Sequence, residues 1–327
     1  MPEVADMAAP RAVIVHRDSE FTELLARHGT RGQVAFFLDQ RGQSLAAVED
    51  RHERTRAALA DVAAGLPVDW RRASVERGEL ARFVFEPDDV ILVVGQDGLV
   101  ANAAKYLGAQ PVIGIDPLPG VNAGVLVPHT PVAGVALVEA AHAGDASVRE
   151  RTMVQVRTDD GQSLTALNEV MIGQPGHQSA RYTLDVAERR ERQSSSGVIV
   201  GTGTGATGWC ASIARIQSPG LALPAPTDRA LAWFVREPWP SPSTGAGLLA
   251  GRLDAGTPGA WLTLRVESDR LVAFGDGMED DRLSLSWGQS VSITLAERTL
   301  RTVDGASRPL RERAGRARPA ATGSTPA

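Results

Sequence analysis

The chain of 327 residues has one cysteine and no long hydrophobic run. Because Cys210 has no partner, an intramolecular disulfide is excluded, and such cysteine usage is typical of a reducing compartment. No stretch is apolar over the length that a membrane-spanning helix needs. The acidic N-terminal segment lacks a basic region followed by an apolar run, so we expect no signal peptide. These absences predict a cytoplasmic protein without a membrane segment.

Lysine is almost absent as well, because Lys105 is the only one and arginine supplies nearly all positive charge. The formal net charge of -5 argues against a surface built to attract nucleic acid or anionic lipid. Phosphate contacts are therefore expected from guanidinium groups or backbone amides. The histidines are scattered without the spacing of metal ligands, so we predict no protein-held metal.

The first part of the chain alternates predicted strands with predicted helices. Strands are expected over 11–15, 68–70, 90–94 and 112–115, and helices over 19–28, 44–64, 79–85 and the amphipathic stretch after residue 97. This alternation predicts an α/β domain with a doubly wound, mostly parallel sheet.

After about Pro128 the pattern changes to short strands. Apolar and polar residues alternate over 147–158 and 163–172 around an Asp-Asp-Gly turn, which indicates a hairpin. Further strands are expected over 182–186, 198–200, 230–235, 261–266, 271–274 and 290–295, with one helix from about 207 to 216. The spacing predicts a β-rich, sandwich-like domain.

We therefore divide the chain into four segments. Residues 1–10 are a flexible N-terminus, 11–127 the α/β nucleotide-binding domain and 128–304 the β-rich domain. Residues 305–327 are rich in Arg, Pro and Ala with almost no core formers, and we expect them to be disordered. A solvated appendage is the preferred interpretation of this basic tail, and contact with an acidic partner is the alternative.

The segment 90–107 reads VILVVGQDGLVANAAKYL, an apolar strand followed by a turn and a helix. Asp97 stands between Gly95 and Gly98, where backbone N–H groups and a helix N-terminus can hold phosphate. The alternative is an ordinary strand-to-helix turn, in which Asp-Gly only supplies turn chemistry.

A second candidate is Asn168-Glu169, at the start of NEVMIG in an otherwise alternating strand. An amide beside a carboxylate suits the two hydroxyls of a ribose. A polar pair at a strand edge, facing solvent, is the alternative.

The third candidate is SSGVIVGTGTGATGWCASI, residues 195–213, a strand, a Gly/Thr-rich turn and a helix. Its glycines satisfy G-x-G-x-x-G, but a proline-rich loop follows where a dinucleotide-binding βαβ unit needs a strand ending in an acidic residue. We therefore reject a dehydrogenase. The turn offers backbone N–H groups and the hydroxyls of Thr202, Thr204 and Thr207.

The fourth candidate is FGDGMEDD, residues 274–281, a dense acidic turn between two β segments. It has enough carboxylates for a Mg²⁺ ion, whereas a solvated hairpin tip is the alternative.

The order GQDG, PVIGID, NEV, SSGVIVGTGTGATGW and GDG resembles the NAD kinases, in which ATP phosphorylates the 2′-hydroxyl of the adenosine ribose of NAD. The resemblance covers most of residues 11–300 and is nearest to the mitochondrial-type branch, whose late motif also reads SSG followed by TGTG. It implies an α/β domain and a β-rich NAD-binding domain with the site between them. It also implies NAD and ATP as substrates, Mg²⁺ carried by ATP, and a homodimer or homotetramer.

The resemblance also implies roles for single residues. The family's GGDG aspartate falls on Asp97, which would orient or deprotonate the attacking hydroxyl, and its Asn-Glu pair falls on Asn168 and Glu169, which would hold the ribose. Its Thr-Ala-Tyr segment falls on 207–209, where the aromatic ring would pack against NAD. The further nucleotide-binding residues so implied are Gly95, Gln96, Gly98, Thr202, Thr204, Thr207, Gly208, Trp209 and Ser212.

Three residues depart from the family pattern on the ATP side. Gln96 puts a side chain where phosphate approaches, Leu99 removes a hydroxyl, and Asp116 adds negative charge. These departures leave open a catalytically degenerate NAD(P)-binding homologue. A lipid or sphingoid-base kinase, which shares a glycine-bracketed aspartate, is a further alternative, disfavoured by the Asn-Glu pair and the Thr-rich turn.

Overall fold

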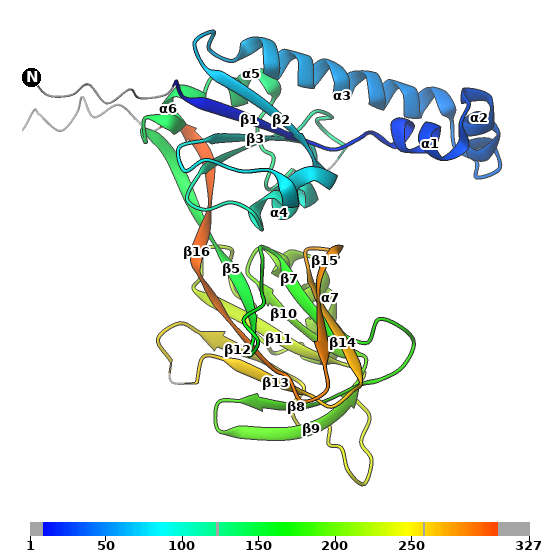
Figure 1. Cartoon of the computed structure of the whole chain (residues 1–327), viewed down its shortest axis with the longest axis vertical. Helices are drawn as coiled ribbons and strands as arrows, with labels where there is room; N and C mark the ends of the chain where they lie inside the picture. Colours follow the sequence, from blue (N-terminus) through cyan, green and yellow to red (C-terminus); the bar gives the residue numbers. More distant parts are fainter. Residues whose placement is uncertain (1–8, 122–123, 258, 307–327) are drawn as a thin grey trace, which may run out of the picture.

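The computed structural model describes residues 9–121, 124–257 and 259–306. They form an N-terminal α/β part and a β-rich part with mixed and antiparallel sheets, which confirms the predicted classes of the two regions (Figure 1). Residues 1–8 of the predicted flexible N-terminus and 307–327 of the predicted tail lie outside the described residues. Gly305 and Ala306, assigned to the tail, instead end the last strand.

Four parallel strands form the centre of the α/β part, in the order β2 (Arg71–Glu76), β1 (Arg11–His16), β3 (Val90–Val94) and β4 (Pro111–Ile115). Strands β1, β3 and β4 are almost entirely apolar because helices cover the sheet on both faces. The chain moves from β1 to β2 in one direction and from β3 to β4 in the other. The order therefore reverses between β1 and β3.

Helices cover this sheet on two faces. The long α3 (Leu45–Gly65) packs on one face with α5 (Pro131–Val135) and α6 (Val138–His142). The other face is covered by α4 (Asp97–Ala104) and the 3-10 helix η1 (Arg77–Arg82). In Figure 1 α3 lies above the sheet, whereas α4 lies below it, on the side of the β-rich part.

Two short helices, α1 (Glu20–His28) and α2 (Arg31–Asp39), extend this part beside the N-terminal end of α3 and share a small core with it. Ser19 begins α1 by accepting a hydrogen bond from Thr22 N–H, and Gly29, at φ 80°, ends it. The predictions for α1 and α3 are confirmed. Helix α2 was not predicted, and the strand predicted at 68–70 lies at 71–76 instead. The helix predicted at 79–85 is the 3-10 helix η1 at 77–82.

In the β-rich part, an antiparallel sheet has the order β12-β11-β10-β7-β14-β15. Its strands are Ala250–Asp254, Ala230–Arg236, Gly197–Thr202, Glu169–Gly173, Arg270–Gly275 and Met278–Ser286 in that order. Helix α7 (Trp209–Gln217) packs on its outer face. The other face meets strands β5, β6, β8, β9, β13 and β16, which span Ala146–Thr158, Ser163–Ala166, Ala180–Val186, Arg189–Ser195, Leu262–Val266 and Ser290–Ala306.

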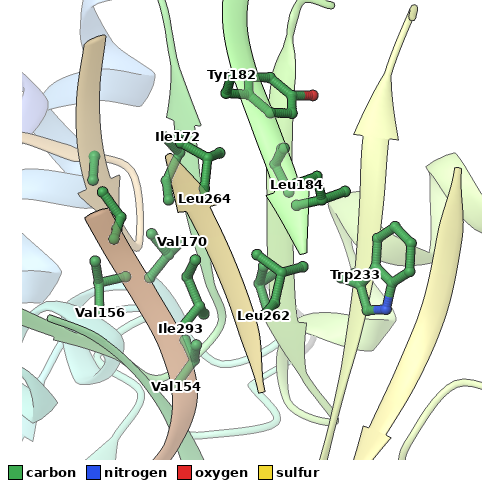
Figure 2. Close-up of a cluster of buried hydrophobic side chains, with 14 of the residues drawn as sticks. Val154, Val156, Val170, Ile172, Tyr182, Leu184, Trp233, Leu262, Leu264 and Ile293 are labelled. Carbon is green, nitrogen blue, oxygen red and sulfur yellow. The ribbon is translucent and has the colours of Figure 1, made fainter. Parts of the chain in front are cut away.

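The core of the β-rich part lies between these two sheets. Figure 2 shows Val170, Ile172 and Trp233 from one sheet among Tyr182 and Leu262 from the other, all buried. Apolar and polar residues alternate along β8 and β13, which turns one side of each toward this layer. Strands β10 and β11 are instead buried on both faces, because α7 covers the outer one.

Two long strands, β5 and β16, pass between the two parts (Figure 1). They pair antiparallel over most of their length, and the end of β16 also pairs parallel with β4, Arg301 opposite Pro111. The predicted strand at 290–295 is therefore too short. The division at 127–128 and 304 stays a prediction, although α5, α6 and the end of β16 all pack with the first part.

The predicted strand at 163–172 breaks in the middle. Strands β6 and β7 belong to different sheets, and Leu167 and Asn168 connect them. Strands β9, β12 and β15 were not predicted. In the ranges that the structure describes, no helix has both the length and the apolar character to cross a membrane.

Candidate functional site

A cavity of about 500 Å³ opens at the carboxyl ends of the parallel strands. The segments that follow β1, β2, β3 and β4 all contribute to its wall, through 17–20, Arg77, the residues Gly95, Gln96 and Gly98, and 117–118. Open α/β sheets bind ligands at this edge, where the strand order reverses. Here the reversal lies between β1 and β3. Asp276, from the β-rich part, also lines the cavity.

Asp97 is the first residue of α4 and is half-buried beside this cavity. Its carboxylate accepts hydrogen bonds from Leu126 N–H at 2.8 Å and Val125 N–H at 3.1 Å. Gly114 in β4 permits that loop to approach, since a Cβ there would lie 1.9 Å from the Leu126 carbonyl oxygen. A carboxylate has about four acceptor positions, so Asp97 keeps capacity for further hydrogen bonds.

The three departures from the family pattern have different surroundings. Gln96 lies exposed on the cavity wall, at the N-cap of α4, and in the described chain its side chain makes no capping bond. Leu99 is buried and packs over Gly95, where a Cβ would lie 2.8 Å from its Cδ2. Asp116 accepts a bond from Leu118 N–H at 2.8 Å and shapes the loop after β4.

In the acidic segment between β14 and β15, Asp276 packs against the backbone that joins β6 to β7, whereas Gly277, Glu279 and Asp280 are exposed. Asp276, at φ 55°, accepts hydrogen bonds from Asn168 N–H at 2.7 Å and Leu167 N–H at 2.8 Å. Its own N–H donates to the Glu169 carbonyl at 3.1 Å. This turn therefore fixes the break between β6 and β7 and holds both residues of the Asn-Glu pair.

Burial changes the chemistry of the two neighbouring carboxyl groups. It raises the pKa of Glu169 to about 7, with a smaller contribution from the charge of Asp276. It also raises the pKa of Asp276 to about 6, against the lowering effect of the amides that it accepts. Near neutral pH Glu169 can therefore accept or donate a hydrogen bond to a hydroxyl group.

The Gly/Thr-rich turn packs directly on the Asn-Glu pair. Thr202 donates its N–H to the Asn168 carbonyl at 2.8 Å and its hydroxyl to the Leu167 carbonyl at 2.5 Å. A Cβ at Gly205 would lie 2.3 Å from the same Asn168 oxygen, which explains a glycine there. The Thr202 hydroxyl therefore stabilises the fold by bonding the backbone, whereas the Thr204 hydroxyl is buried without a partner among the described residues.

The remaining predicted residues lie apart from the cavity. Thr207 donates its hydroxyl to the Thr204 carbonyl at 3.2 Å. Gly208, Trp209 and Ser212 are exposed at the start of α7 and, as far as the described chain defines the cavity, are not part of its wall. The Trp209 ring is 38% exposed, and the Arg236 guanidinium lies 5.3 Å from its centre. The predicted residues thus divide into a group at the cavity and a group at the Asn-Glu pair and α7.

Two polar residues that no motif marked, Asn102 in α4 and Lys105 directly after it, connect the two parts. Asn102 accepts from Arg77 Nε at 2.7 Å and donates to the Asp276 carbonyl at 3.1 Å. The buried Lys105 pairs with Asp281 at 2.6 Å and donates to the Gly275 carbonyl at 3.2 Å. Their i, i+3 spacing in an otherwise apolar helix was the available signal.

These contacts occupy two of the four carboxylates in the acidic segment 274–281, whereas Glu279 and Asp280 are exposed. Asp281 is paired with Lys105 and accepts from the Tyr106 hydroxyl at 3.0 Å, and Asp276 accepts backbone amides. Over the described ranges, no group of three His, Cys, Asp or Glu side chains is arranged to hold a metal ion. Comparison with known proteins finds neither a matching family model nor a matching curated relative.

Proposed function

We propose that this protein is an ATP-dependent NAD kinase with an NAD kinase-like fold, which phosphorylates the 2′-hydroxyl of the adenosine ribose of NAD. One observation carries the proposal. Helix α4 begins at Asp97 beside the cavity and, through Asn102, is hydrogen-bonded to the Asp276 turn that holds Asn168 and Glu169. The base candidate Asp97 and the cavity are therefore linked through one helix to the pair that we propose binds the ribose.

Each group has a defined task in this reaction. The donor triphosphate with its Mg²⁺ occupies the cavity, where the backbone amides of Gln96 and Gly98 at the start of α4 are available to phosphate. Asn168 and Glu169 hold the ribose hydroxyls of NAD. Asp97 accepts the proton of the 2′-hydroxyl as that oxygen bonds to the γ-phosphorus and the β–γ bridging bond breaks to release ADP. Positioning supplies most of the remaining rate enhancement.

The test is NADP formation by the purified full chain with ATP, MgCl₂ and NAD. Loss of a general base typically lowers the rate about 10²–10⁴-fold, and we expect Asp97→Asn to do so. Asp159→Asn, in the distant β5–β6 hairpin, is the matched control and should keep wild-type activity. Wild-type protein that forms no more NADP than Asp97→Asn would disprove the kinase.

A second function, binding of NAD or NADP without phosphoryl transfer, is favoured by one observation. The Asp97 carboxylate is already bound by two loop amides, and the Gln96 side chain stands on the cavity wall. This function predicts calorimetric binding of NAD without binding of ATP. Turnover would remove it. The homodimer or homotetramer and the cytoplasmic location stay predictions.

A further inference from the structure

Arg77 contributes a positive charge to the cavity that no neighbouring acid neutralises. It follows β2 directly as the first residue of η1, and it lines the cavity. Over residues 9–121, 124–257 and 259–306, its side chain makes one hydrogen bond, from Nε to Asn102, and no ion pair within 4.0 Å. A half-buried guanidinium group without an acidic partner is costly unless an anion meets it.

The other arginines of the cavity are already neutralised. Arg17 pairs with Glu23 at 3.0 Å, and Arg51 pairs with Glu20 at 2.6 Å. The Asp276 carboxylate is directed to the amides of 167–168 and not to Arg77. The remaining acidic residue on the wall, besides Glu20, Glu23 and Asp276, is Asp18, which lies on the loop after β1. Within the described cavity, Arg77 is therefore the arginine without an acidic partner, and an incoming anion can pair with it.

The guanidinium group is also held in one orientation. Asn102 is only 5% exposed, accepts from Arg77 Nε, and is itself anchored to the Asp276 carbonyl. The bond at Nε leaves the two terminal nitrogens for a ligand. Their planar fork matches two oxygens of a phosphate group.

We propose that Arg77 binds phosphate oxygens of the phosphoryl donor inside this cavity, facing the amides at the start of α4. The assignment of the ligand as the donor rests on the proposed function. The recognised chemistry is a phosphate oxyanion, which ATP and inorganic polyphosphate both supply. No sequence motif marked Arg77, because only the folded sheet brings the end of β2 beside the Gly95–Gly98 turn.

Calorimetric titration of the full chain tests this role with two probes, magnesium tripolyphosphate and the non-hydrolysable ATP analogue AMP-PNP with Mg²⁺. Because charge-assisted hydrogen bonds to the ligand are lost, Arg77→Gln should bind both probes about 10- to 100-fold more weakly. Arg77→Lys, which keeps the charge but not the fork, should lose less. Arg82→Gln, exposed at the end of the same η1 segment, is the matched control and should bind as wild type.

The outcomes separate this inference from the proposed function. Equal loss for both probes assigns Arg77 to the phosphate chain, and loss for AMP-PNP alone assigns it to a nucleotide donor. If Arg77→Gln and Arg82→Gln bind both probes with equal affinity and unchanged thermal unfolding, the role of Arg77 is overturned. It is also overturned if the wild-type protein binds neither probe. If probes bind through Arg77 but no NADP forms, only the proposed function fails. If NADP forms, Arg77→Gln should raise KM for ATP and leave KM for NAD unchanged.

Discussion

The two halves of the proposed site differ in how many of their polar groups already have hydrogen-bond partners within the protein. On the α/β side, Gln96, Gly98 and the guanidinium of Arg77, which has no acidic partner among the described residues, line a cavity. On the β-rich side, Thr202, the backbone of 167–169 and Asp276 satisfy one another. The difference is between a cavity lined by polar groups on one side and, on the other, a mutually hydrogen-bonded support around Asn168 and Glu169.

The largest expected effect comes from the junction between the halves. Lys105→Met leaves Asp281 without its cation, and loss of one partner of a buried pair costs about 3–5 kcal/mol. Because the Asp281 side chain is 21% exposed, we expect unfolding to become easier by about 2–3 kcal/mol in urea. Lys105→Met combined with Asp281→Leu should recover part of this loss. A single variant as stable as wild type would show that the pair does not hold the junction.

The next effect tests whether the β-rich half is rigid because of Asp276. Asp276→Ala leaves the amides of Leu167 and Asn168 without an acceptor, at a cost of about 1–3 kcal/mol. NAD affinity should fall in parallel, since Asn168 loses its support. Asp280→Ala, exposed nearby on β15, is the control and should change neither quantity. Unchanged NAD binding by Asp276→Ala would separate this turn from the ribose site.

The raised pKa of Glu169 predicts how stability depends on pH. Its ordinary value of 4.5 applies to the unfolded chain and about 7 to the folded chain. Between these values the folded chain holds more protons, so the free energy of unfolding decreases as pH rises from about 4.5 to 7 and then levels off. Glu169→Gln should remove the slope above pH 6, while Asp276 still contributes below it. Urea titrations at pH 5, 6, 7 and 8 measure this, and an identical slope in Glu169→Gln contradicts it.

The smallest effect concerns communication between the halves. Asn102→Leu removes the amide that joins Arg77 to the Asp276 carbonyl. If the two ligand sites are coupled through this amide, AMP-PNP should strengthen NAD binding by about fivefold in wild type and not in the variant. Calorimetry of NAD with and without AMP-PNP measures both. Equal enhancement in the two proteins would mean that Asn102 does not carry the coupling.

Helices and strands that depend on neighbouring residues were predicted correctly from local sequence patterns. The apolar run Val90–Val94, the Ser19 cap of α1 and the periodicity of α3 led to correct elements. The pairing of β16 with β4 could not be predicted this way, because Arg301 and its partner Pro111 lie far apart in the sequence. The break at Asn168 was missed for a similar reason: its cause is Asp276, a distant residue that binds the amides of the break.

The candidate site follows the same rule. Asp97, Asn168 and Glu169 could be chosen from short motifs, since glycine-bracketed acids and amide–carboxylate pairs are visible in sequence. Arg77 and Asn102 carry no such signature, and their contact exists only because η1 packs against α4. Trp209 and Ser212 were grouped with the site by resemblance. They lie at the start of α7 and, like Asn168 and Glu169, are not part of the described cavity wall, so their role stays a prediction.

The position of the transferred phosphate tests the central claim most directly. Full-length protein should be incubated with NAD, ATP and MgCl₂, and the dinucleotide product analysed by ³¹P NMR. We predict a new phosphomonoester resonance that matches the 2′-phosphate of NADP, and its absence with Asp97→Asn. A dinucleotide fraction that contains only the pyrophosphate resonances of NAD, at any enzyme concentration, would contradict the account.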